Sequence, residues 1–119
     1  MSVNIGKVSD QQIKMNGWLV GSFIKDSDFN DKNVEICFKV LKEGTFVDRL
    51  HKHPKGKEYI IIISGELTIQ VGTEIVNLKS GDYITIPANT PDKIEKIINE
   101  VSLICDRYPS VPNNKVFLD

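Results

Sequence analysis

The feature of this sequence that most limits its fold is a succession of short apolar segments separated by turn residues. About nine such segments lie between Trp18 and Tyr108, and no stretch shows the apolar period of a long helix. Short strands with turn signals at close spacing are typical of an all-β sandwich or barrel. A chain of 119 residues can bury one hydrophobic core. We therefore expect one all-β domain over residues 1–119.

The strands are expected to occupy the apolar segments between the turns. In chain order they are Trp18–Phe23, Val34–Val40, Thr45–His53, Glu58–Ser64, Leu67–Val71, Ile75–Leu78, Tyr83–Ile86, Ile94–Ile98 and Val101–Tyr108. Residues 1–16 are expected to form an N-terminal arm, either loosely packed or paired as an edge strand, with Ser9 capping a short helical turn. Residues 109–119 are expected to form an irregular tail, held in place by its apolar residues near Phe117.

Three details of these strands can be tested against a structure. Apolar and mostly polar residues alternate along Val34–Val40. This pattern predicts that the side chains of the even-numbered residues face the interior. A tight turn is expected at Gly65, and a second break at Asn99 and Glu100. The segment Glu58–Ser64 is apolar on both faces, so its outer face requires a cover: a second sheet, the arm or another subunit.

The two histidines of the protein, His51 and His53, are separated by one residue. Alternate residues of a strand point to the same face, so the two imidazoles are predicted to lie side by side. A short turn follows, and Glu58 begins the next strand, where its carboxylate can reach the same space. Two imidazoles and a carboxylate suit a divalent first-row metal and leave coordination positions open. In isolation, an H-x-H pair is more often two surface histidines.

The spacing of these residues resembles the first signature motif of the cupin superfamily. Gly44 is followed by six residues, His51-x-His53, four residues, Glu58, six residues and Gly65, and each defining residue of the motif is present. The resemblance implies a jelly-roll barrel, also described as a double-stranded β-helix. It also implies a divalent metal, such as Mn, Fe, Ni or Zn, inside that barrel.

A second segment resembles the second cupin motif in part. Gly81 and Pro87 are in register with it, and Asn89 replaces a glycine, a mild change because Asn tolerates positive φ. Asp92 occupies the position of the last histidine ligand. The resemblance therefore implies a metal held by His51, His53, Glu58 and Asp92. Asp92 is interpreted either as a ligand through its carboxylate or as a solvated turn residue.

Composition excludes several classes of partner. The net charge is −1 and the pI is about 6.1, so there is no basic surface that would indicate nucleic acid binding. The sequence has neither an apolar run long enough for a transmembrane helix nor a secretory leader, so a cytoplasmic location is expected by default. Cys37 and Cys105 lack C-x-x-C spacing and are interpreted as free thiols in the interior.

Three functions remain open from the sequence. The first is a metal-binding cupin that takes a small oxygenated molecule into its barrel, as an enzyme or as a binding protein. The second is a sensor or binding module without turnover, and the third is a metal-free scaffold.

Arg49 either faces the ligands, where it would bind an anionic group, or reaches solvent. Arg107 and Tyr83 could contribute to acid–base chemistry, but the preferred interpretation of both is structural. The chain is expected to form a homodimer.

Overall fold

The computed structural model describes residues 3–44 and 46–119, and these form one helix and eight strands. In chain order the elements are α1 (Val8–Lys14), β1 (Trp18–Val20), β2 (Glu35–Leu41), β3 (His51–Lys52), β4 (Lys57–Val71), β5 (Glu74–Lys79), β6 (Tyr83–Ile86), β7 (Asp92–Tyr108) and β8 (Val116–Phe117). Thr45, the first residue of one predicted strand, lies outside the described residues.

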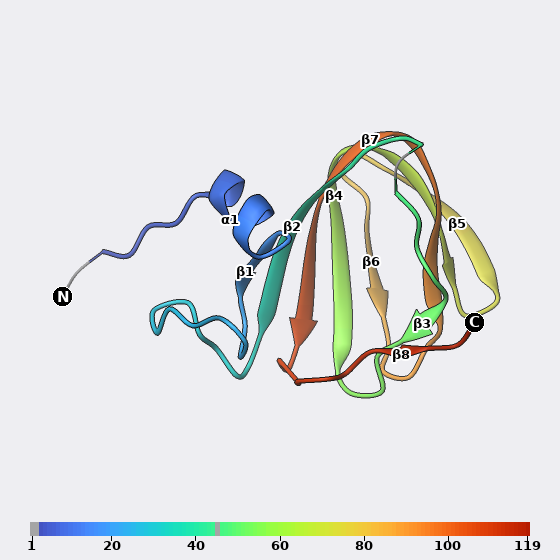
Figure 1. Cartoon of the computed structure of the whole chain (residues 1–119). Helices are drawn as coiled ribbons and strands as arrows, with labels where there is room; N and C mark the ends of the chain where they lie inside the picture. The colour runs from blue at the N-terminus through green and yellow to red at the C-terminus, as the bar shows by residue number, and fades with distance from the viewer. Residues whose placement is uncertain (1–2, 45) are drawn as a thin grey trace.

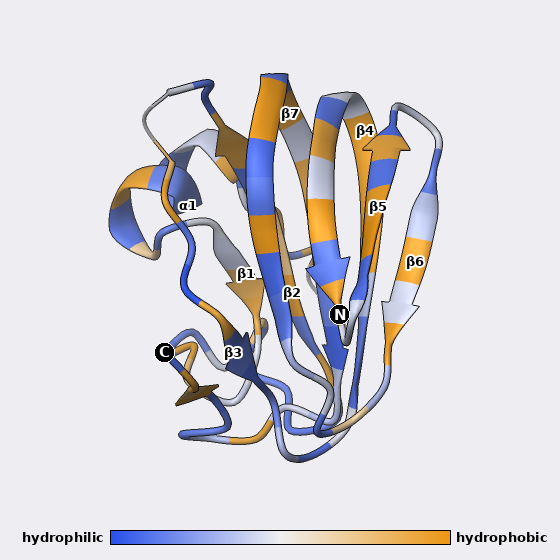
Figure 2. Ribbon diagram, turned by 90° about the vertical axis from the view of Figure 1, so that its right-hand side faces the viewer, coloured by the Kyte–Doolittle hydropathy of each residue, from blue (hydrophilic) through white to orange (hydrophobic). Residues whose placement is uncertain are grey.

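The strands form one hydrogen-bonded sheet that curls around an interior (Figure 1). Its main path runs β1-β2-β7-β3-β8, while β4 pairs with β5, β6 and β7. Hydrophobic and hydrophilic residues alternate along the strands, as expected where one face is covered (Figure 2). Residues 3–7, before α1, extend away from this body (Figure 1). The predicted all-β jelly-roll barrel is confirmed.

Two predicted breaks are wrong, because β4 and β7 each bend without ending. The pairing of β4 with β7 continues on both sides of Gly65, with register shifts between Ile62 and Leu67. Gly65 has φ +87°, and a Cβ atom placed there would lie 2.0 Å from the carbonyl oxygen of Glu100. Only glycine allows this close approach. Turn-forming residues therefore mark a sharp bend at which the hydrogen bonding between β4 and β7 continues. Register shifts of this kind increase the local twist of a strand.

The bend brings the two ends of β7 to the same end of the barrel. Asp92 begins this strand and Arg107 lies near its end, and a straight strand of that length would separate them by about 50 Å. Both residues instead line one cavity inside the barrel. The candidate site described below depends on this geometry.

The prediction of which face of β2 is buried is also wrong. Glu35, Cys37 and Leu41 are buried, whereas the even-numbered side chains face outward and Val40 is 40% exposed. Both faces of this strand carry apolar residues, so alternation alone does not identify the inner one. The charge of Glu35 is accepted inside because Arg107 and Ser110 bind its carboxylate.

The segments at the two ends of the fold differ in detail from the prediction. Helix α1 begins after Lys7, and no side chain caps it, so Ser9 is not the cap residue. Of the predicted strand Thr45–His53, only His51–Lys52 forms a strand, and residues 46–50 are not in regular structure. In the tail, Phe117 pairs with His51 and Val116 pairs with Lys52, which fixes the tail against β3.

The core is the set of apolar side chains that β2, β4, β5, β6 and β7 direct inward. Those that are almost fully buried are Ile62, Leu67, Ile69, Val101 and Cys37. Cys37 and Cys105 are buried free thiols, as predicted, and they occupy directly opposed positions of β2 and β7. No helix of the described chain is long and apolar enough to cross a membrane.

Candidate metal centre

His51 and His53 lie at one end of β3, and both side chains are buried. The backbone of His51 pairs with Asp92 at the start of β7 on one side and with Phe117 of β8 on the other. The ring centroids of the two histidines are 5.2 Å apart. The predicted side-by-side arrangement is therefore present, although the strand that carries it is short.

Each imidazole is oriented by a backbone carbonyl. Nδ1 of His51 lies 2.6 Å from the carbonyl oxygen of Arg49, and Nδ1 of His53 lies 2.8 Å from that of Asn114. A carbonyl oxygen only accepts hydrogen bonds, so Nδ1 carries the proton in both neutral rings. The lone pair is then on Nε2. Metal-binding histidines are commonly oriented in this way.

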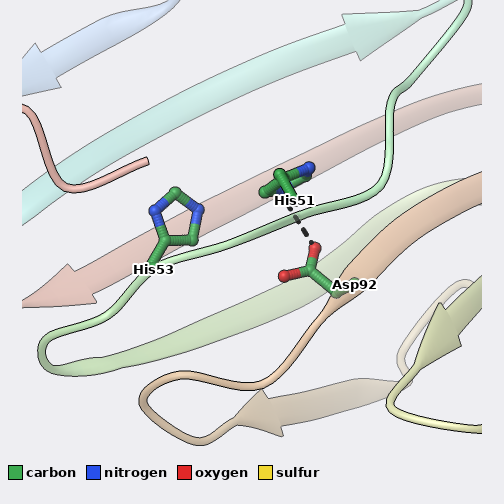
Figure 3. Close-up of side chains that lie close together, drawn as sticks. All are labelled: His51, His53 and Asp92. Atoms are coloured by element: carbon green, nitrogen blue, oxygen red, sulfur yellow. Dashed lines mark ion pairs between the residues drawn. The ribbon is translucent and has the colours of Figure 1, made fainter. Parts of the chain in front are cut away.

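Asp92 completes a group of three buried side chains (Figure 3). One potential ligand atom from each of His51, His53 and Asp92 lies within 4.8 Å of the other two. Nε2 of His51 is 3.3 Å from Oδ1 of Asp92. Nε2 of His53 and Oδ2 of Asp92 are buried and have no hydrogen-bond partner among the described residues. Buried polar atoms are normally satisfied, so these two atoms point to a partner such as a metal ion.

Glu58 adjoins this group and is held by Arg107. Its Oε2 lies 3.3 Å from Nε2 of His53 and accepts a 2.6 Å hydrogen bond from Nε of Arg107. Arg107 also approaches Glu35, at 3.4 Å. Glu35, Arg107 and Glu58 are direct cross-strand neighbours on β2, β7 and β4. The cation therefore lies between two buried carboxylates.

The surroundings of the two histidines shift their pKa values in opposite directions. Burial disfavours the charged form of His51, but hydrogen bonds to Asp92 and to the Arg49 carbonyl outweigh it, and its pKa lies above the ordinary value. Burial and the nearby Arg107 cation hold the pKa of His53 below its ordinary value. His53 is therefore the ring that more readily offers a free lone pair near neutral pH.

A cavity of about 230 Å³ opens beside these residues inside the barrel. His51, Asp92, Glu58 and Arg107 lie on its wall together with apolar side chains such as Ile60. Ligand sites are commonly apolar pockets with a few convergent polar groups. This cavity is smaller than most, so it suits a small molecule.

The structure brings together most of the residues that the sequence singled out. His51, His53 and Asp92 form one group, and Glu58 contacts it through His53. Arg49 does not face the ligands: it pairs with Asp119 at 2.9 Å and is more than half exposed. The second interpretation of Arg49, in which it reaches solvent, therefore matches the structure.

The preferred interpretation of Arg107 from the sequence was structural, and its hydrogen bond to Glu58 was not predicted. One signal was available, because the residues at alternate positions before Arg107, namely Val101, Leu103 and Cys105, are apolar. Asn89 behaves as predicted. Its φ is +63°, and its N–H donates a 2.7 Å hydrogen bond to the carbonyl of His53, which ties the turn before Asp92 to β3.

Comparison with known proteins agrees with this architecture. The family model described as a cupin domain matches residues 38–96, which include both histidines, Glu58 and Asp92. An uncharacterized protein of Methanocaldococcus jannaschii is 39% identical over 61 residues, which are 50% of this chain and 49% of that protein. The match thus spans about half the length of this curated relative.

Several solved structures share the fold at low sequence identity. A cupin protein from Bacteroides fragilis is 22% identical with a TM-score of 0.59, over 67% of this chain and 69% of that chain. The DMSP lyase DddQ from Ruegeria pomeroyi is 18% identical with a TM-score of 0.65, over 75% and 45%. The nucleoside dehydratase Pac13 of Streptomyces is 16% identical with a TM-score of 0.63, over 74% and 70%.

The fold and the family match together define the class of protein. The chain is a small domain of the cupin superfamily. Structural similarity at these identities establishes the fold alone, because cupins perform many different functions. What this domain binds must therefore be argued from its own residues.

Proposed function

We propose that this cupin binds a divalent metal ion through His51, His53 and Asp92, with Glu58 as a further oxygen donor. We propose in addition that it binds a small oxygenated molecule in the barrel beside the metal. The observation that supports this most directly is a pair of buried atoms, Nε2 of His53 and Oδ2 of Asp92, that have no hydrogen-bond partner within residues 3–44 and 46–119. A metal ion between the side chains would satisfy both.

The donor set fits such an ion in chemistry and charge. Two imidazole nitrogens and one or two carboxylate oxygens suit Mn, Fe(II), Ni or Zn. The orientation of both rings by backbone carbonyls supports ligation through Nε2. Arg107 balances part of the charge of Glu58 and fixes the position of its carboxylate.

In this proposal the metal would supply Lewis acidity toward an oxygen atom of the bound molecule. The chain's own residues bind and orient that molecule. The apolar wall around Ile60 limits access of water and increases the strength of polar contacts inside the cavity. Arg107 keeps Glu58 at one side of the site, next to His53.

The test is elemental analysis of protein purified without chelator, followed by thermal unfolding of metal-free protein with added Mn, Fe, Co, Ni or Zn. We expect about one metal per chain. We also expect about 2.7 kcal/mol of stabilisation at a metal concentration of roughly 100 times Kd. His51→Ala removes a buried ligand and should abolish both effects, whereas Lys52→Ala on the same strand should retain them. Absence of metal in the parent, with no thermal shift from any of the five ions, would contradict the proposal.

A further inference from the structure

We infer that the molecule bound in the barrel is a small carboxylate, and that Lys39 of β2 binds its anionic group. This inference deepens the proposed function, since it assigns a chemical class to the ligand of the same cavity. It rests on the position of Lys39, on the balance of charge around the cavity and on the size of the cavity.

Lys39 belongs to the inward face of β2. It stands opposite Leu103 of β7, which is almost fully buried, and the residues two positions away, Cys37 and Leu41, are buried as well. Its side chain is half-buried and lines the cavity that contains His51 and Asp92. A lysine directed toward the interior of a strand-built barrel requires an explanation, because charged groups are rarely placed there without a partner.

Lys39 has no ion pair among residues 3–44 and 46–119. Its ammonium nitrogen lies 6.0 Å from the centre of the Trp18 ring. Arg107, the other cation of this wall, is bound to Glu58 and Glu35. Lys39 is therefore the cation of the β2–β7 wall that remains available to a ligand.

The charge around the cavity favours an anion once metal is bound. The charged side chains on the wall are Asp48, Glu58, Asp92, Lys39, Arg107 and Lys115. Their formal charges balance. Glu35 binds Arg107 from outside this wall, so a divalent metal would leave a net excess of one positive charge around the cavity. Lys115 also has no ion pair in the described chain and lies 5.2 Å from the centre of the Phe117 ring. A carboxylate between the metal and Lys39 would reduce this excess.

The size of the cavity and its apolar wall further restrict the class of ligand. The volume of about 230 Å³ is below the range typical of drug-sized ligands. Leu41, Ile60 and Leu103 form the apolar part of the wall. A short organic acid fits this pattern, because its carboxylate can meet Lys39 or the metal while its few carbons contact the apolar side chains.

The experiment compares acids with their neutral amides in the full chain. Acetate, lactate and malate are titrated beside acetamide, lactamide and malamide by calorimetry and by fluorescence of Trp18, the single tryptophan. Each titration uses both Mn-saturated protein and protein made metal-free by dialysis. At least one acid should bind ten or more times as tightly as its amide. Lys39→Met should weaken the binding of this acid about tenfold. Lys39→Arg and the exposed control Lys79→Met should bind the acid with the affinity of the parent.

The outcomes separate this inference from the proposed function. Failure of every metal to bind would contradict the metal site, while the titrations of metal-free protein would still test Lys39. The thermal shift with metal should be the same in Lys39→Met as in the parent, since Lys39 is not in the ligand group. The inference is overturned if no acid is preferred over its amide, or if Lys39→Met binds the acid as tightly as the parent.

Discussion

At the scale of single residues, Asp92 determines the donor set of the proposed metal site. It occupies the position of a family histidine, and the structure places its carboxylate 3.3 Å from Nε2 of His51. Two carboxylates and two imidazoles form a harder donor set than three imidazoles and one carboxylate. This set should shift relative preference toward Mn and Fe(II).

We therefore predict that Asp92→Ala weakens metal binding about 10- to 100-fold but does not abolish it, because two histidines and Glu58 remain. Asp92→His should restore the usual ligand set of the family and tighten binding of Ni, Co or Zn. Competition with a chromogenic chelator measures both effects. Asp106→Asn, on the outward face of the same strand, is the control. Unchanged affinity of Asp92→Ala for every metal would show that Asp92 is a turn residue.

The same scale shows why part of the site could be predicted. His51, His53 and Glu58 lie close together in sequence, so strand periodicity and one short turn suffice to place them near one another. The pairing of Arg107 with Glu35 depends on the register between β2 and β7, which are 72 residues apart at this point. Sequence periodicity carries no information on that register, so the pairing of Arg107 with Glu35 was not predicted.

At the scale of elements, the bend shared by β4 and β7 positions the site. We predict that Gly65→Ala destabilises the fold by more than about 2 kcal/mol, because its Cβ would collide with the Glu100 carbonyl and its φ is +87°. Gly72→Ala is the matched control: φ is also positive, but the space around it is open. It should cost only about 1 kcal/mol. Urea unfolding of both variants measures the difference, and equal losses would show that strain alone, not the close approach, matters at Gly65.

This bend also shows what the sequence could not predict about the strands. Gly65, Asn99 and Glu100 correctly indicated a change of chain direction, and the segments on either side were correctly predicted as strands. A turn signal does not report whether hydrogen bonding continues through the bend. That depends on the neighbouring strand, which bends at the same place.

At the scale of the whole molecule, the outward face of the sheet carries a row of apolar side chains. Tyr83, Ile61, Ile104 and Phe38 are successive cross-strand partners on β6, β4, β7 and β2. Tyr83 is 77% exposed and Ile61 is 40% exposed. Residues 3–7, before α1, extend from the body (Figure 1), and Ile5 among them is 83% exposed. A contiguous exposed apolar surface commonly marks an interface.

We propose that this face joins two copies of the chain in a two-fold homodimer, the commonest closed assembly. Ile61→Glu would place a charge in the centre of the row and should convert the dimer to a monomer, as measured by light scattering at micromolar concentration. Ile75→Glu is the control, because Ile75 is 65% exposed but lies on β5, outside the row. Metal-induced thermal shifts should be the same in both variants, since neither residue lines the cavity. A monomer mass for the parent chain, or equal dissociation in the two variants, would contradict an interface at this face.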